Sequence, residues 1–215
     1  MAIRPLWRSV TGHGRAYAIR PYVSTKYIDR IKLIGCKMKV DVNGWLSGVR
    51  RIASPNCDAR PSGTSIALLV VHNISLPPGE FGGEAVTQLF TNTLNTDAHP
   101  YYKQLEGLRV SAHFLIRRDG AITQFVPCGM RAWHAGVSLW QGRSACNNFS
   151  IGIELEGSDD VPFSDLQYAA LARLTRLLRR SYPIRAIVGH ADIAPGRKTD
   201  PGRCFDWPRY LAAAE

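Results

Sequence analysis

Residues 189–202 concentrate side chains that could bind a metal ion. This stretch holds His190, Lys198 and Asp200 among several Gly and Pro residues, so we predict a stiff loop. His190 and Asp200 could turn back on one ion if a third ligand came from elsewhere, and the candidate is His72, which directly follows the apolar run 66–71. Two imidazoles and one carboxylate leave the fourth position of a tetrahedral zinc ion open, which is typical of catalytic zinc.

Simpler explanations exist for each of these residues. His190 alone could cap a strand, and Asp200 alone could cap a turn. A site of nitrogen and oxygen ligands could also hold another divalent ion. The three residues together favour a zinc site.

Hydrolysis at such a site needs a base, and we predict Glu154 for this role. Glu154 lies between Ile153 and Leu155, so its side chain points away from both apolar neighbours. Glu156 points the same way further along the strand and is the weaker candidate. The alternative for Glu154 is a structural ion pair. Lys198 could place an ammonium group near a developing oxyanion, although a loop lysine by itself is usually only solvated.

The elements that position these residues can be read from apolar patterns. Residues 66–71 are six consecutive apolar residues, which predicts a strand that is buried on both faces. The runs 110–116 and 121–126 flank an Asp-Gly pair and predict a β-hairpin. Residues 149–157 and 184–188 predict two further strands, the second leading into His190.

Helices alternate with these strands. Ser164 and Gln167 form the sequence of a capping box, which predicts the start of a long helix. We expect its inner face to include Leu166, Ala169, Ala170, Leu174, Leu177 and Leu178 and its arginines to face solvent. Residues 84–94 and 207–214 predict shorter helices, and residues 45–63 predict a surface loop. The expected fold class is α/β (α+β): a central mixed β-sheet flanked by helices.

The positive charge is concentrated at the N-terminus. Residues 1–37 hold eight Lys/Arg and one acid, a net charge of +7, which leaves +3 of the total +10 for residues 38–215. We therefore expect no nucleic-acid partner. We also expect residues 1–37 to be a basic extension that is not part of the fold, and residues 38–215 to form one domain.

The cysteines and the apolar runs bear on location. Five widely spaced cysteines without a CxxC pair argue against a disulfide framework and fit a reducing compartment. No apolar run approaches the roughly 18 residues that span a bilayer. Residues 1–37 lack the pattern of an export signal. We expect a cytoplasmic protein, a monomer, with no membrane partner.

Six segments together resemble one known family. They are LLVVHN around His72, PPGEFGG, VSAHFLIRRDG, RAWHAG around His134, SIGIELEG around Glu154, and GH…RKTDPG around His190 and Asp200. From about residue 38 to the C-terminus these motifs resemble, in order, the zinc N-acetylmuramoyl-L-alanine amidases. The resemblance is greatest to the branch that acts on 1,6-anhydro-N-acetylmuramyl-L-alanine in the cytoplasm of Gram-negative bacteria.

This resemblance implies a zinc ion on His72, His190 and Asp200, with Glu154 and Lys198 in the catalytic roles argued above. It also implies the fold of phage amidases and peptidoglycan recognition proteins, and a function in recycling cell-wall muropeptides. Many relatives have a tyrosine where this chain has Ala112, which leaves Glu154 as the stronger base. We expect the adjacent His113 to be a core residue.

Four residues are candidates for binding the muropeptide. Arg109 could pair with a carboxylate of the stem peptide, and Trp133 offers a flat face to a sugar. Asn73 and His134 are expected beside the cleft. Each of the four could instead be an ordinary packing or surface residue. Two other functions stay open: an amidase that acts on intact peptidoglycan in the periplasm or as a lytic enzyme, and a peptidoglycan-binding module without catalysis.

Overall fold

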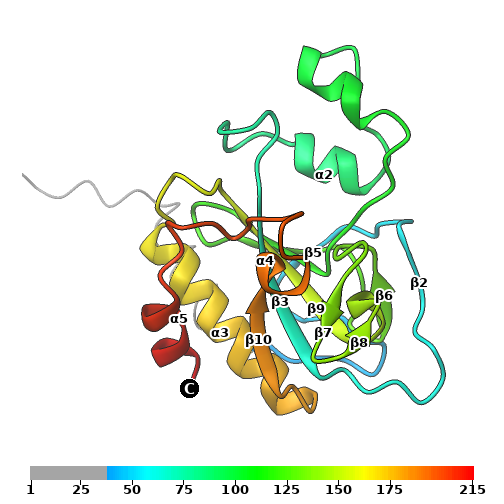
Figure 1. Cartoon of the computed structure of the whole chain (residues 1–215), viewed down its shortest axis with the longest axis vertical. Helices are drawn as coiled ribbons and strands as arrows, with labels where there is room; N and C mark the ends of the chain where they lie inside the picture. Colours follow the sequence, from blue (N-terminus) through cyan, green and yellow to red (C-terminus); the bar gives the residue numbers. More distant parts are fainter. Residues whose placement is uncertain (1–37) are drawn as a thin grey trace, which may run out of the picture. The chain divides into compact units, whose positions relative to one another are not determined.

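The computed structural model describes residues 38–215 (Figure 1), so the prediction for residues 1–37 lies outside the described part of the chain. Within residues 38–215, six strands form one sheet in the order β1-β5-β4-β9-β3-β10. In chain order these strands are β1 (Arg50–Arg51), β3 (Leu68–Ile74), β4 (Phe114–Ile116), β5 (Ile122–Gln124), β9 (Ser150–Glu156) and β10 (Ala186–Gly189).

The sheet is mixed, as predicted. Strand β3 runs parallel to both β9 and β10, and β9 runs parallel to β4. Strands β4 and β5 form the predicted antiparallel hairpin. Its turn contains Gly120 with a φ of +79°, a left-handed conformation that glycine adopts without strain. Strand β1 extends the sheet beside β5.

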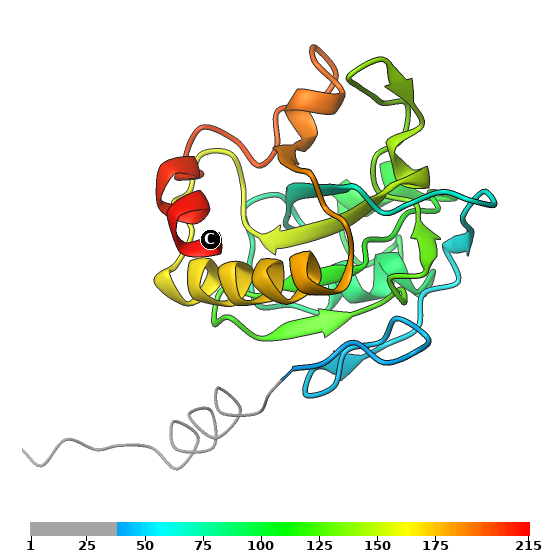
Figure 2. The same ribbon diagram turned by 90° about the horizontal axis from the view of Figure 1, so that it is seen from below.

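Alternation along β3 and β9 divides the core into two layers. Leu69 and Val71 pack with Ile151 and Ile153 in one cluster, which also includes residues of α3 (Asp165–Ser181) and α5 (Trp207–Ala214). Figure 2 shows α3 lying along this face of the sheet, with α5 beside it. The intervening residues of both strands point to the opposite face. His72 and Glu154 therefore lie on the side of the sheet away from α3.

Helix α3 begins at the predicted capping box: Ser164 Oγ accepts the Gln167 N–H, and the Gln167 side chain accepts the Ser164 N–H. The predicted inner face is wrong at Leu166, which is 53% exposed, and at Ala169, which is also exposed, while Gln167 is fully buried. The Gln167 amide donates to the carbonyl oxygens of Ile116 and Glu156, joining the helix to the ends of β4 and β9. A buried polar residue therefore takes the inward position.

The opposite face of the sheet is covered by shorter elements. The 3-10 helix η2 (Cys146–Asn148) precedes β9, and α2 (Ala85–Phe90) and the 3-10 helix η1 (Pro100–Leu105) pack over Leu115 of β4. Helix α2 confirms the helix predicted within residues 84–94, although it is shorter. Two small antiparallel sheets complete the fold: β2 (Cys57–Ala59) with β6 (Met130–Ala132), and β7 (Leu139–Trp140) with β8 (Arg143–Ser144).

Two local predictions are corrected by the structure. Residues 45–63 were expected to be a surface loop, but they contribute β1 and β2, which pair with distant strands. The predicted stiff loop 189–202 begins with a helical turn, α4 (His190–Ile193). The Asp192 carboxylate accepts the Gly189 N–H and so caps this turn. None of the described helices is both long and apolar enough to cross a bilayer. The described cysteines, Cys57, Cys128, Cys146 and Cys204, are free.

Candidate active site

Three of the predicted side chains converge at one point. His72 lies on β3, and His190 begins α4 directly after the neighbouring strand β10. His72 Nδ1 lies 3.0 Å from His190 Nδ1 and 3.0 Å from Asp200 Oδ2, and His190 Nδ1 lies 3.1 Å from the same oxygen. Both histidines are buried. The structure thus brings together the three residues that the sequence suggested as metal ligands.

The chemistry of this donor set fits a cation. His190 Nε2 lies 3.1 Å from the Ala135 carbonyl oxygen. A carbonyl oxygen can only accept, so Nε2 carries the hydrogen, and in the neutral ring Nδ1 presents a lone pair. That lone pair faces the Asp200 carboxylate. Two electron-rich atoms at this separation repel one another unless a positive charge or a proton lies between them.

The electrostatics of the ligands agree with this fit. Burial lowers the pKa of His72 to about 4, although the contact with Asp200 acts in the opposite direction, so the ring is neutral at pH 7. Burial would raise the pKa of the Asp200 carboxyl, but its contacts with the His190 and His72 rings hold this pKa well below its usual range. Neutral imidazole and ionised carboxylate are the forms that bind a metal ion.

Glu154 lies directly beside this group. In the parallel pairing of β3 with β9, Glu154 is the partner of His72. Glu154 is 9% exposed, and its Oε2 is buried without a hydrogen-bond partner among the described residues. Burial raises the pKa of Glu154 well above its usual range, the negative charge of Asp200 raises it further, and Lys198 lowers it. A carboxyl group with a raised pKa suits proton transfer near neutral pH.

Glu156, the second carboxylate on this face of β9, has a different environment. Its Oε1 accepts the Gly82 N–H at 2.7 Å, and its Oε2 accepts the Arg118 N–H at 3.0 Å. Both oxygens of Glu156 therefore hold loops in place. The contrast with Glu154 supports the choice of base made from the sequence.

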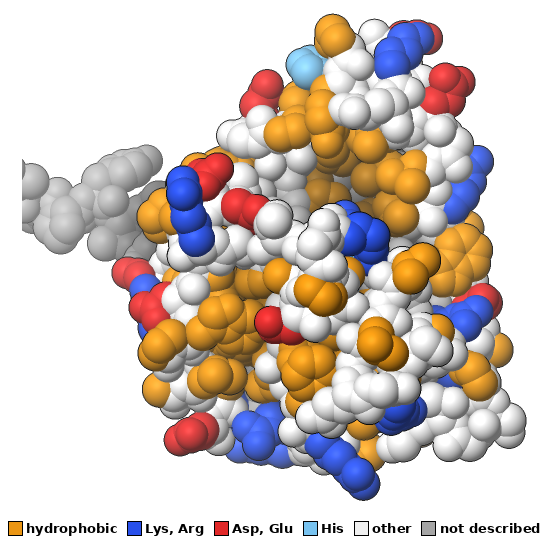
Figure 3. Space-filling view, in the orientation of Figure 1, with side chains coloured by type: hydrophobic (Ala, Val, Ile, Leu, Met, Phe, Trp, Pro, Cys, Tyr) orange, Lys and Arg blue, Asp and Glu red, His pale blue; other side chains and the backbone are white. Residues whose placement is uncertain are grey.

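The convergent residues lie in a cleft of about 580 Å³. Its polar lining residues include Glu154, His190, Lys198 and Asp200. An apolar group of lining residues, which we call the apolar wall, includes residues of α2 and η1; its members are Leu76, Leu89, Phe90, Tyr101, Leu105, Leu108 and Val110. In Figure 3, hydrophobic side chains gather on the visible face around α2. The cleft thus combines polar, ionisable residues with an apolar wall.

The predicted substrate-binding residues divide into two pairs. Asn73 and His134 line the cleft, whereas Arg109 and Trp133 are not among its lining residues. Arg109 is exposed, and its neighbours Val110 and Ser111 reach the cleft. The Trp133 side chain is half-buried and hydrogen-bonds the Asp58 carboxylate.

Asn73 has a clear structural function. Its side-chain amide donates to Asp159 Oδ1 at 2.7 Å and to the Pro201 carbonyl oxygen at 3.0 Å. These bonds tie the loop that carries Asp200 to the end of β3. The amide nitrogen of Asn73 is therefore occupied within the protein.

Some residues of the cleft were missed from the sequence. The apolar wall comes from residues that have no motif of their own and reach the cleft only because α2 and η1 fold over the sheet. Arg197 also lines the cleft, and its guanidinium donates to the carbonyl oxygens of Ala135 and Val137. The only signal for Arg197 was its place beside Lys198.

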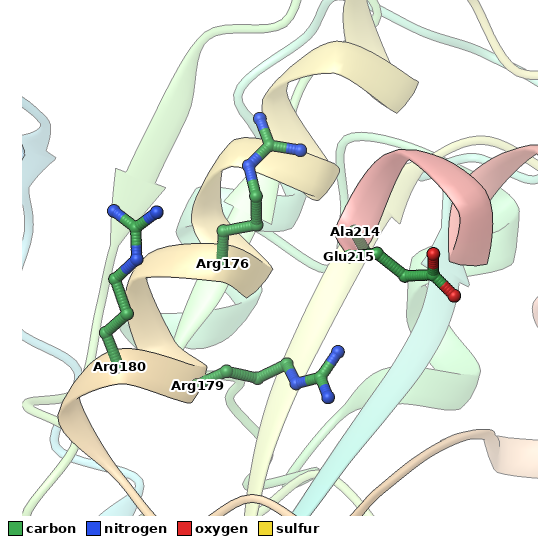
Figure 4. Close-up of a pocket in the computed structure, with 5 residues that line it drawn as sticks. All are labelled: Arg176, Arg179, Arg180, Ala214 and Glu215. Carbon is green, nitrogen blue, oxygen red and sulfur yellow. The ribbon is translucent and has the colours of Figure 1, made fainter.

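A second, smaller hollow of about 240 Å³ lies at the ends of α3 and α5 (Figure 4). It is lined by Arg176, Arg179, Arg180, Ala214 and Glu215 and shares no residue with the cleft. Arg176 donates to the Ala213 carbonyl oxygen, and Figure 4 shows Arg179 extending on the side of α5. Cations at the C-terminal ends of helices offset the helix dipoles, which gives these arginines a structural role.

Comparison with known proteins agrees with this geometry. Residues 62–203 match the family described as N-acetylmuramoyl-L-alanine amidase. The 1,6-anhydro-N-acetylmuramyl-L-alanine amidase AmpD of Salmonella typhimurium (strain SL1344) is 60% identical over 171 residues, which cover 79% of this chain and 91% of that protein. AmpD of Escherichia coli (strain K12) is 59% identical over 169 residues, covering 78% of this chain and 92% of the relative.

Solved structures show the same relationship. A crystal structure of a selenomethionine AmpD derivative has a TM-score of 0.81 and 56% identity, and the match covers 83% of this chain and all of that one. The amidase AmiD from E. coli, in complex with the substrate anhydro-N-acetylmuramic acid-L-Ala-D-gamma-Glu-L-Lys, has a TM-score of 0.51 and 32% identity, covering 81% of this chain and 65% of AmiD. This chain belongs to the N-acetylmuramoyl-L-alanine amidase family.

Proposed function

We propose that this amidase uses zinc, held by His72, His190 and Asp200, to hydrolyse the amide between the lactyl group of 1,6-anhydro-N-acetylmuramic acid and the first L-alanine of a muropeptide. The observation that carries the proposal is the convergence of three metal-ligand atoms beside a buried, unpartnered Glu154 oxygen in one cleft. The similarity to AmpD proteins supports the choice of substrate.

The chain's own residues account for the proton transfers. When bound, zinc acts as a Lewis acid towards the scissile carbonyl and the attacking water. The Glu154 carboxylate accepts a proton from that water as the new carbon–oxygen bond forms. Lys198 stabilises the negative charge that develops on the former carbonyl oxygen. Glu154 then gives its proton to the alanine nitrogen as the carbon–nitrogen bond breaks, which releases the free stem peptide and the muramic acid carboxylate.

Lys198→Met tests the second catalytic residue through the pH profile. We expect kcat/KM to fall by roughly 10²–10³-fold, as for loss of an oxyanion-stabilising group. Glu154 must be ionised to accept a proton, and Lys198 lowers its pKa. Removing the ammonium should therefore raise the pKa of Glu154 and move the acid limb of the pH profile of kcat/KM to higher pH. The fall in kcat/KM should then be larger at acidic pH than at neutral pH. Lys198→Arg, which keeps the charge, is the control and should keep the position of the limb. An unmoved limb in the Met variant would contradict the coupling to Glu154.

We further propose that the enzyme works as a monomer in the cytoplasm, recycling small muropeptides, without nucleic-acid or membrane partners. The cysteine spacing and the low net charge of residues 38–215 support this assignment. The names of the AmpD relatives, which specify the 1,6-anhydro sugar, support a soluble muropeptide rather than intact wall.

Product analysis by mass spectrometry tests the proposed function. Zinc-loaded protein is incubated with anhydromuramyl tripeptide, with intact sacculi, and with the tripeptide substrate in the presence of a chelator. We expect release of free tripeptide from the small substrate only, and none in the chelated sample. Release of peptides from sacculi would favour an amidase of intact peptidoglycan, and no cleavage of either would favour a binding module.

We also propose that residues 38–215 form the amidase domain and that residues 1–37 are not part of its fold. Met38 and Val40 already pack against the main core cluster, and Val40 bridges to Leu46. A chain that begins at Met38 should keep kcat/KM within about twofold of the full chain and unfold at a similar temperature. The reason is that it keeps every named residue of the main core cluster. Loss of soluble, folded protein on removing residues 1–37, seen by circular dichroism and thermal melting, would contradict this domain boundary.

A further inference from the structure

A row of polar contacts runs from the candidate metal site into the protein behind it. His72 turns Nδ1 towards Asp200 and His190, and its other ring nitrogen, Nε2, lies 2.9 Å from His134 Nδ1. His134 Nε2 in turn lies 3.1 Å from Ser150 Oγ. His72, His134 and Ser150 are all buried, so their polar atoms must satisfy one another.

We infer that His134 is a positioning residue that controls which ring nitrogen of His72 carries the hydrogen. A neutral imidazole has one N–H and one lone pair. If His134 Nε2 donates to the Ser150 hydroxyl, then His134 Nδ1 must accept, and His72 Nε2 donates to it. His72 Nδ1 is then left with a lone pair that points to Asp200 and His190, which is the form required of a metal ligand.

The same three residues also permit the opposite direction of hydrogen bonding, in which every donor and acceptor is exchanged. The Ser150 hydroxyl can donate to His134 Nε2, His134 Nδ1–H to His72 Nε2, and His72 Nδ1–H to Asp200 Oδ2. Both orders contain the same number of hydrogens, and in both the contact between His72 Nε2 and His134 Nδ1 joins one donor to one acceptor. The row of contacts can therefore reverse between a metal-free state, in which His72 Nδ1–H donates to Asp200 Oδ2, and a metal-bound state, in which the His72 Nδ1 lone pair would face the ion.

Packing holds His134 in the position that this function needs. A Cβ atom at Gly152 would lie 2.4 Å from Cγ of the His134 ring, so only glycine lets the ring approach β9 this closely. The Asn147 side chain accepts the His134 N–H at 3.2 Å and the Ala135 N–H at 2.8 Å, which holds the backbone. The His134 ring meets the His72 ring edge-on, with centroids 5.0 Å apart.

His134 therefore has a different function from the substrate contact predicted from the sequence. Although His134 lines the cleft, both of its ring nitrogens contact protein atoms and are not free to bind a muropeptide. The inference rests on the proposed function in one respect only, that His72 is a zinc ligand.

Two variants of similar shape test the inference, His134→Asn and His134→Leu. The Asn side-chain oxygen can accept the His72 Nε2–H near the place of His134 Nδ1, whereas Leu cannot. We expect the zinc dissociation constant, measured by competition with a chromophoric chelator, to rise by about 10–100-fold in the Leu variant and to stay within a few-fold of the unsubstituted protein in the Asn variant. Nitrogen NMR of the zinc-loaded unsubstituted protein and Asn variant should show His72 protonated at Nε2.

Failure of the inference about His134 can be told apart from failure of the proposed function. Equal zinc affinity in the Leu variant and the unsubstituted protein overturns the inference, and so does an equal loss in the Asn and Leu variants, which would mean that His134 only fills space. If His134→Leu does not fold, Ser150→Ala replaces it, with an expected loss of about tenfold. Unchanged affinity in that variant also overturns the inference. Failure of the unsubstituted protein to bind one zinc ion would instead refute the proposed function.

Discussion

Glu154→Gln should lower kcat by about 10²–10⁴-fold, the range for loss of a general acid–base group, while zinc remains bound. The amide has nearly the shape of the carboxylate but cannot accept a proton from water. Zinc should stay bound because Glu154 is not one of the three candidate ligand residues. Single-turnover cleavage of anhydromuramyl tripeptide and zinc content by atomic spectroscopy measure the two effects separately.

Glu156→Gln is the matched control, because both residues lie on β9 with their side chains on the same face. Glu156 accepts two backbone N–H groups, so its replacement should lower the free energy of unfolding by about 1–3 kcal/mol and leave the activity of the folded protein nearly unchanged. A Glu154→Gln enzyme that turns over at the full rate would rule out Glu154 as the base. Equal losses of activity in both variants would point to a structural role.

Asp200→Ala should abolish both zinc binding and activity. This change removes the only negatively charged atom among the three candidate ligands and leaves two buried imidazoles. We expect the loss of zinc affinity to exceed the roughly 10–100-fold that removal of an outer-shell partner costs. Binding can be measured by competition with a chelator, and activity by release of free tripeptide.

Thermal melting gives an independent measure of the same effect. A ligand at about 1,000 times its dissociation constant stabilises the folded state by about 4 kcal/mol, so a chelator should lower the melting temperature of the unsubstituted protein. The chelator should leave the Asp200→Ala variant unaffected. Asp160→Ala, which removes an exposed ion pair with Arg203, is the control and should behave as the unsubstituted protein does. Full zinc occupancy and turnover in Asp200→Ala would refute the assignment of this ligand.

Much of the fold follows from local patterns in the sequence. The continuous apolar run at residues 66–71 predicts β3, and the Asp-Gly pair between two β-rich runs predicts the β4–β5 hairpin. The capping box at Ser164 predicts the first turn of α3, and helix α5 spans the predicted residues 207–214. These features depend on backbone propensities and on hydrogen bonds between residues close in sequence, so they can be read without knowing the tertiary structure.

The candidate metal ligands and the base could also be proposed from the sequence, because residue type and position at a strand end limit the possibilities. Their meeting depends on the parallel pairing of β3 with β9 and β10, which brings His72 beside Glu154 and beside His190, a residue 118 positions away. The sequence supplied the candidates, and the sheet register decided that they share one site.

Only the tertiary structure decided the surroundings of that site. The apolar wall forms because α2 and η1 pack over β4. No local sequence pattern predicts where the segment that contains these two helices will pack. Asn73 holds the loop of Asp200, and both ring nitrogens of His134 contact protein atoms, although the sequence suggested substrate contacts for both residues. Side-chain hydrogen bonds of this kind join residues that are distant in sequence. Their partners exist only after the strands and loops have packed, which is why the sequence suggests the candidate ligands but not the residues that hold them in place.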